Sequence, residues 1–166
     1  MFGFIRRKGK KRAVFRLKRE NYRVRQQEII LEERVIDFEF VNMETEEDYD
    51  RSSRFGTNVL ILFNSCFELG EIEMMAASPE EPPAFFHRLA PADPDREIVI
   101  ERDMTLWAKC SEVDEGILIW LPVKVKKTVS VECDDVVFYL DREKVVGILI
   151  RNKKAEQGKE VRETST

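Results

Sequence analysis

The sequence has little of the chemistry on which most enzyme active sites depend. Its 166 residues include one histidine, His87, with three cysteines and seven glycines. A single histidine excludes a histidine-rich metal site, and the glycines form neither a Gly-x-Gly-x-x-Gly nor a Gly-Lys-Ser/Thr phosphate loop. Any serine or cysteine hydrolase mechanism would have to use His87 as its base. The sequence therefore favours a non-enzymatic binding or adaptor module, and it predicts no catalytic residue, metal or cofactor.

Paired cysteines and long apolar runs are also missing. Cys66, Cys110 and Cys133 are odd in number and far apart, so they form neither a disulfide framework nor a paired zinc knuckle. The longest apolar runs, at 59–63 and 116–122, fall well short of the roughly 20 residues that a membrane-spanning helix needs. The apolar start of the chain is too short for a signal-peptide core. We expect a cytoplasmic protein without a transmembrane segment.

Charge is abundant and very unevenly distributed. Residues 1–25 contain eleven basic side chains and one acid, a charge of +10, which leaves −14 for the remainder because the whole chain carries −4. Basic side chains bind anionic bilayers at about 1 kcal/mol each and bind nucleic acids by releasing counterions. We therefore expect contact with an anionic partner, either a nucleic acid or a membrane face, through Arg6, Arg7, Lys8, Lys10, Lys11, Arg12, Arg19 and Arg23.

The same basic stretch also admits a structural interpretation. Residues 28–50 carry ten acids against Arg34 alone, so the basic stretch can fold back along them. Exposed ion pairs of this kind contribute only about 0–1 kcal/mol each. Ahead of the charges, Phe2, Phe4 and Ile5 would supply an apolar contact at a membrane interface. A protein partner or a homo-oligomer also remains open.

Hydrophobic periodicity predicts a mainly β fold. Ile36, Phe38 and Phe40 alternate with acids, as in a half-buried strand, and 57–63 is a short apolar run typical of a buried strand. Dense strand patterns follow between 97 and 150, with turn residues at 114–116 and 141–144. About nine or ten short strands with little helix predict a β-barrel or β-sandwich.

The domain organisation follows from composition. We expect a basic N-terminal arm at 1–12, a single mainly-β domain at 13–150 and a frayed charged tail at 151–166. Residues 78–94 contain five of the six prolines and predict a loop laid across the sheet, although a boundary between two subdomains is the alternative. The acid-rich stretch 42–56 predicts an exposed loop.

Two further functional hypotheses rest on specific residues. Arg19-Glu-Asn-Tyr-Arg23 resembles the Arg-x-x-x-Arg motif of PilZ domains, β-barrels whose family binds cyclic diguanylate through such arginines. The family's second motif, Asp/Asn-x-Ser-x-x-Gly, is not matched, because 64–70 has a different spacing. The resemblance implies a phosphate-ligand or cyclic-dinucleotide receptor using Arg19 and Arg23. The other hypothesis is a metal-dependent hydrolase using the acids Asp95, Glu97, Glu101 and Asp103.

The strand patterns also predict individual positions. Gly147, inside an apolar strand, indicates a β-bulge or the close approach of another backbone. Cysteines within strands are expected to be small core residues. Side chains expected on buried faces are Phe38, Phe40, Leu60, Leu62, Leu118, Trp120, Phe138 and Ile148.

Overall fold

The fold is mainly β, as the sequence predicts. A computed structural model of the chain describes residues 14–30, 32–41, 49, 51–77, 79–87 and 91–151. Within them lie twelve strands in three antiparallel sheets and one four-residue helix, α1 (Ala84–His87). The described strands form no closed barrel. No helix in the described ranges is long and apolar enough to cross a membrane.

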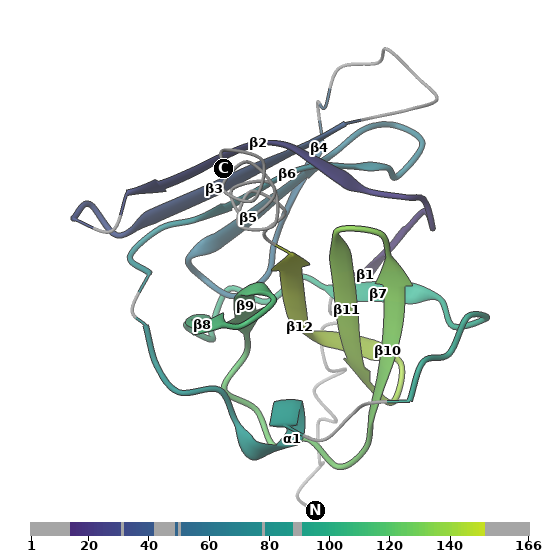
Figure 1. Cartoon of the computed structure of the whole chain (residues 1–166). Coiled ribbons are helices and arrows are strands. Elements are labelled where there is room, and N and C mark those ends of the chain that lie inside the picture. The colour runs from purple at the N-terminus through teal and green to yellow at the C-terminus, as the bar shows by residue number, and fades with distance from the viewer. Residues whose placement is uncertain are drawn as a thin grey trace, which may run out of the picture.

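The first half of the chain builds a five-stranded sheet, which we call the N-terminal sheet (Figure 1). Its spatial order is β2 (Arg23–Ile30), β3 (Val35–Val41), β6 (Leu69–Met74), β5 (Val59–Phe63) and β4 (Arg51–Arg54). The strand β4 lies within the stretch 42–56, where we expected only an exposed loop. Residues 42–48 and 50 lie outside the described residues.

The second half builds the C-terminal sheet. Its order is β10 (Thr128–Cys133), β11 (Val136–Asp141), β12 (Lys144–Arg151), β9 (Gly116–Trp120) and β8 (Lys109–Val113). Two-residue turns at 114–115 and 142–143 close the hairpins where the sequence predicts turns. Within the stretch 97–150, where we expected dense strands, residues 102–108 form a loop and β8 begins only at Lys109.

A two-stranded ribbon joins the beginning of the chain to its middle. In this ribbon, β1 (Val14–Leu17) pairs with β7 (Ile98–Glu101) in antiparallel register, with Val14 opposite Glu101 and Leu17 opposite Ile98. We call this pair the β1–β7 ribbon. The chain therefore enters the described fold at Val14, beside the end of β7.

Side chains from both five-stranded sheets meet in one hydrophobic core. Ile36, Phe38 and Phe40 are buried and alternate with half-buried acids, as predicted. The prediction that Leu60 and Leu62 are buried is wrong, because β5 buries the opposite set of side chains and leaves these two half-buried. Leu60 and Leu62 lie opposite Glu73 and Glu71 on the outer face. The other predicted core residues, Leu118, Trp120, Phe138 and Ile148, are buried.

The outer face of the C-terminal sheet carries a second, smaller cluster. Leu118, Trp120, Val137 and Leu149 form it, and Phe86 of α1 packs against it. Figure 1 places α1 on the side of this sheet away from the N-terminal sheet. The Phe86 ring meets Tyr139 edge to face, with ring centroids 5.0 Å apart. Part of the proline-rich stretch therefore covers the sheet.

Gly147 has one of the two features that its position predicts, an irregular strand register, and the other prediction, a close backbone, is wrong. The register between β11 and β12 shifts after Tyr139, which pairs with Gly147. A Cβ atom at position 147 would lie 2.5 Å from Cζ of Phe86, closer than any real contact. The close neighbour is therefore an aromatic side chain and not a backbone. Glycine allows Phe86 to lie directly on the strand.

Candidate functional site

The described part of the basic stretch is largely ion-paired with carboxylates. Arg16 contacts Glu97 at 2.9 Å, Lys18 contacts Glu20 at 2.8 Å and Arg23 contacts Asp134 at 2.9 Å. Two of these acids belong to the C-terminal half of the chain and none lies in the acidic stretch 28–50. The basic residues at 14–23 thus tie the start of the chain to the body of the protein.

The six cations at the start of the chain lie outside the described residues. These are Arg6, Arg7, Lys8, Lys10, Lys11 and Arg12. The structure does show where the basic segment joins the fold. Val14 is exposed and lines a pocket that also contains Asp95, Glu97 and Lys144. The contact predicted for residues 6–12 stays a prediction.

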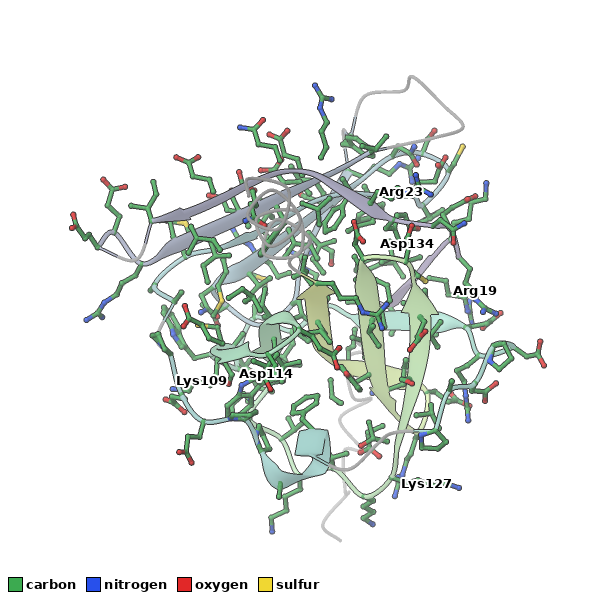
Figure 2. The ribbon with its side chains drawn as sticks, in the orientation of Figure 1. Arg19, Arg23, Lys109, Asp114, Lys127 and Asp134 are labelled. Atoms are coloured by element: carbon green, nitrogen blue, oxygen red, sulfur yellow. The ribbon has the colours of Figure 1, made fainter. Side chains whose placement is uncertain are left out.

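Arg19 and Arg23 do not converge on one pocket. Arg19 lines an open depression of about 340 Å³ together with Glu20, Asn21, Glu132 and Cys133. Figure 2 shows Arg23 directed to Asp134 and Arg19 apart from it, on the connection between β1 and β2. Two carboxylates beside Arg19 oppose the binding of a phosphate.

The acids proposed for a metal-dependent hydrolase have separate structural tasks. Glu97 pairs with Arg16, and Glu101 pairs with Lys144 at 2.6 Å. Asp103 accepts hydrogen bonds from the backbone N–H groups of Thr105 and Leu106, at 2.7 and 3.1 Å. Across the described ranges, no group of three or more His, Cys, Asp or Glu side chains is placed to hold a metal ion.

The two buried cysteines show no sign of activation. Cys110 and Cys133 are buried, as expected of core residues, whereas Cys66 is exposed. Burial raises the pKa of the Cys110 thiol, and it raises the pKa of Cys133 to about 11. Both buried thiols stay protonated near neutral pH, so neither is a ready nucleophile. The side chain of His87, the last residue of α1, lies outside the described part of the structure.

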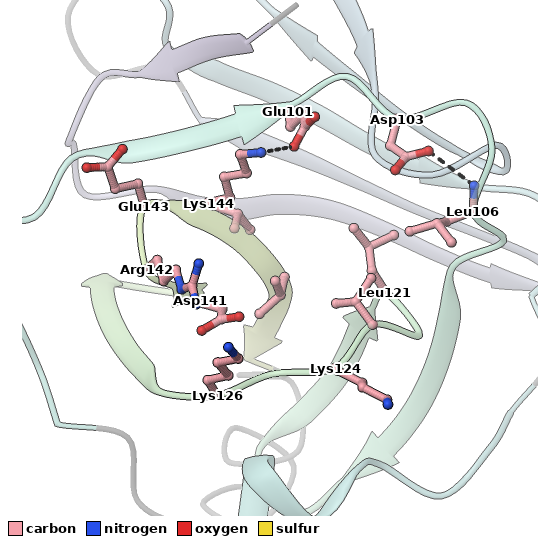
Figure 3. A pocket seen from close by; sticks show the side chains of 13 residues that line it. Glu101, Asp103, Leu106, Leu121, Lys124, Lys126, Asp141, Arg142, Glu143 and Lys144 are labelled. Carbon is pink, nitrogen blue, oxygen red and sulfur yellow. Dashed lines mark hydrogen bonds and ion pairs between the residues drawn. The ribbon is translucent and has the colours of Figure 1, made fainter. Parts of the chain in front are cut away.

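The largest described pocket is a groove between the end of β7 and the β11–β12 turn (Figure 3). Its volume is about 650 Å³, within the range of ligand sites. Leu106, Leu121 and Val145 give it apolar walls, and the Glu101–Lys144 ion pair lies at its edge. Exposed basic side chains without an ion pair to a described residue also line it: Lys124, Lys126 and Arg142.

Sequence reasoning missed this groove. Three lysines cluster at 124, 126 and 127. Their alternation with valines is typical of a strand and does not predict a basic groove. The structure leaves 121–127 without regular secondary structure and places it beside the β11–β12 turn. The pairing of Glu101 with Lys144, which joins the groove to the β1–β7 ribbon, has no signal in the sequence.

A second feature that the sequence did not reveal is a carboxyl pair on the outer face of the N-terminal sheet. Asp37 and Glu71 share a hydrogen bond, and Glu39 and Glu73 lie on the same face. Burial, followed by the interaction with Asp37, raises the pKa of Glu71 from its ordinary value near 4.5 to about 7. Burial likewise raises the pKa of Asp37.

Comparison of the chain with protein-family models, with curated proteins and with solved structures finds no match.

Proposed function

We propose that the chain is a non-enzymatic binding module that contacts an anionic partner through its basic N-terminal segment, residues 1–12. The observation that carries the proposal is the charge distribution. Residues 1–12 hold six cations and no acid, whereas the whole chain has a charge of −4. Downstream, Arg16, Lys18 and Arg23 already have carboxylate partners. The excess positive charge of residues 1–25 therefore rests mainly on residues 1–12.

The groove beside the end of β7 adds no excess of positive charge, because four acids and four basic side chains line it: Glu101, Asp103, Asp141, Glu143, Lys124, Lys126, Arg142 and Lys144. The cluster of one sign on which the proposal rests is therefore residues 6–12. Clustered charges of one sign raise both the encounter rate and the affinity for a partner of the opposite sign.

The architecture we propose for this module is a single β-sandwich domain spanning residues 13–150, with the proline-rich loop at 78–94 and the charged tail at 151–166. Its support is the common hydrophobic core, to which both five-stranded sheets contribute. The receptor hypothesis for Arg19 and Arg23 and the hydrolase hypothesis for the acids near 95–103 gain no support from the placement of those residues.

The test is a pair of matched charge substitutions in the full-length protein. One variant replaces Lys8, Lys10, Lys11 and Arg12 with glutamine, and the control replaces Lys153, Lys154, Lys159 and Arg162, again three lysines and one arginine. Binding to phosphatidylserine vesicles and to a DNA duplex is measured between 25 and 300 mM salt, concentrations chosen as about a tenfold range.

We expect the N-terminal variant to lose binding to the anionic partner and the tail variant to retain it. For a DNA duplex, removing four contacts makes the slope of log K against log salt less negative by about 3.6. Equal behaviour of the two variants, or no binding by the unchanged protein at low salt, would contradict the proposal.

A further inference from the structure

Three large apolar side chains are exposed on two neighbouring segments of the backbone. Met104 and Trp107 lie in the loop at 102–108 and are 55% and 45% exposed, and Met75 follows β6 and is 55% exposed. We call these three residues the apolar tip. Isolated exposed hydrophobic residues are common, but a group of them marks an interaction surface. Tryptophan and methionine are also enriched where proteins meet partners.

Hydrogen bonds from two neighbouring residues hold the apolar tip together. The side-chain amide of Asn58 donates to the carbonyl oxygens of Met75 and Ala108, both at 3.1 Å. Its oxygen accepts the backbone N–H of Ala108 at 2.8 Å. The hydroxyl of Thr57 donates to the carbonyl of Met104 at 2.8 Å. The backbone segments that carry Met75, Met104 and Trp107 are therefore neighbours in space although they come from distant parts of the sequence.

The loop that carries Met104 and Trp107 is well anchored. Asp103 accepts from the backbone N–H groups of Thr105 and Leu106 and from the Thr105 hydroxyl. Gly56, with φ of 77°, lies so close that a Cβ atom there would be 2.9 Å from the Leu106 carbonyl oxygen. The loop is thus fixed by specific contacts that leave its two largest apolar side chains exposed. Such a surface needs no reorganisation to meet a partner.

The start of β1, which the basic segment precedes in the sequence, lies at the same end of the β1–β7 ribbon as the loop of the apolar tip. Because the two strands are antiparallel and Val14 is opposite Glu101, the chain enters β1 where it leaves β7. Only Arg102 and Asp103 separate Glu101 from Met104. The guanidinium of Arg102 lies 3.5 Å from the Met104 sulfur, so a cation also adjoins the tip. The groove that carries Lys124 and Lys126 includes Leu106 of the same loop.

We propose that the anionic partner is a lipid membrane surface and that the apolar tip inserts at the boundary between headgroups and acyl chains. The inference rests on the proposed function and gives the partner its chemical class. Stable peripheral binding requires two signals, a basic cluster and an apolar anchor. The indole of Trp107 suits the interface between water and lipid. Trp107 could stack on a base, but Met75 and Met104 have no such use on a nucleic acid, which binds through aromatic platforms and cations.

The two tryptophans allow a direct test of insertion. Trp120 is buried and donates from its indole N–H to the Ser111 hydroxyl at 3.0 Å. Replacing Trp120 with phenylalanine in the full-length protein leaves Trp107 as the fluorescent reporter. With vesicles of phosphatidylcholine and phosphatidylserine, we expect its emission to shift to shorter wavelength and to be quenched by brominated acyl chains. Circular dichroism checks that this variant folds.

A second measurement compares vesicle binding of variants that retain Trp120. The double variant Met104→Ser with Trp107→Ser should bind the same vesicles about tenfold or more weakly, because it loses most of the apolar anchor. Binding to a DNA duplex should not change. The control is Phe67→Ser, since Phe67 is an exposed aromatic at the other end of the ribbon, where the Lys18 N–H donates to its carbonyl. This control should bind vesicles as the unchanged protein does.

The outcomes separate this inference from the proposed function. Vesicle binding that depends on residues 8–12 but leaves Trp107 emission and the double variant unaffected would overturn insertion and retain the basic segment as a contact. Binding to DNA but not to vesicles would likewise contradict the inference that the partner is a membrane, while the proposal of an anionic partner would stand. If the full-length protein binds neither at low salt, both proposals fail.

Discussion

The two five-stranded sheets share antiparallel pairing and one core, but their outer faces differ. The N-terminal sheet presents half-buried acids there, including Asp37 and Glu71. The C-terminal sheet presents Leu118, Trp120, Val137 and Leu149, all buried. A sheet with a polar outer face needs no cover, whereas an apolar outer face must be covered to remain out of water. The position of Phe86 therefore matters to the second sheet alone.

The largest expected effect comes from matched truncations on the two outer faces. Leu149→Ala, on the C-terminal sheet, should lower the free energy of unfolding by about 2–5 kcal/mol, as for other buried leucines. Leu62→Ala, on the N-terminal sheet, should cost less than half as much, since that side chain is half-buried. Urea unfolding of the two variants measures the difference. Equal losses would mean that the outer faces do not differ in energy.

The contact between Phe86 and Gly147 gives the next effect. Gly147→Ala places a methyl group against the Phe86 ring and should cost about 1–3 kcal/mol, as for other overpacked sites. In a Phe86→Ala background the same substitution should cost clearly less, because the ring is gone. Urea unfolding of the four proteins completes a double-mutant cycle. Strictly additive losses would show that Phe86 does not lie on Gly147 in solution.

These two pairs of variants also show what the sequence could predict. Alternation fixed the inward face of β3, because acids separate its apolar residues. In β5 the apolar run is continuous, so its own residues could not decide between Leu60 and Ile61 as the inward side chain. The orientation of β5 is evident only from its pairing, which places Leu60 and Leu62 opposite Glu73 and Glu71. Such pairing cannot be predicted from the residues of one strand.

The candidate site was less accessible to sequence reasoning than the fold. The charge imbalance of residues 1–25 is evident in the sequence. The ion pairs are not, because Arg16 lies 81 positions from its partner Glu97 and Arg23 lies 111 positions from its partner Asp134. The apolar tip depends on Asn58, a single asparagine that unites segments around 75 and 108. Contacts of this kind have no local pattern, because they depend on how the two halves meet.

The carboxyl pair predicts a pH dependence for the N-terminal sheet. The pKa of Glu71 is raised to about 7 in the folded protein, so folding favours its protonated form. Its stabilising contribution is complete below about pH 4.5 and is lost as the pH rises through about 7. Glu71→Gln should therefore remove part of the decline in melting temperature between pH 5 and pH 8, a range of roughly three units around that transition.

The control for this effect is Glu81→Gln, since Glu81 is exposed and lies outside both sheets. Its melting temperature should follow the pH dependence of the unchanged protein. A Glu71→Gln variant with the same pH profile as the control would mean that the pair does not share a proton.

The smallest expected effect concerns the ion pair between the two sheets. Arg23 of β2 contacts Asp134 in the β10–β11 turn, and both side chains are partly exposed. Arg23→Gln should change the free energy of unfolding by only about 0–1 kcal/mol, and less at high salt. Urea unfolding at low and high salt measures it. A loss similar to that of Leu149→Ala would show that polar contacts, and not the shared core, hold the sheets together.

The β1–β7 ribbon has a consequence for the order in which the protein folds. Most strand pairs join neighbours in the sequence, so their hairpins form as soon as both strands are synthesised. The strand β1 must instead wait for β7, and Arg16 meets Glu97 only after 81 further residues have followed it. The first strand made is thus paired only after β2 to β6, all synthesised later, have had their partners available. Until β7 emerges from the ribosome, β1 lacks the strand with which it pairs in the folded protein.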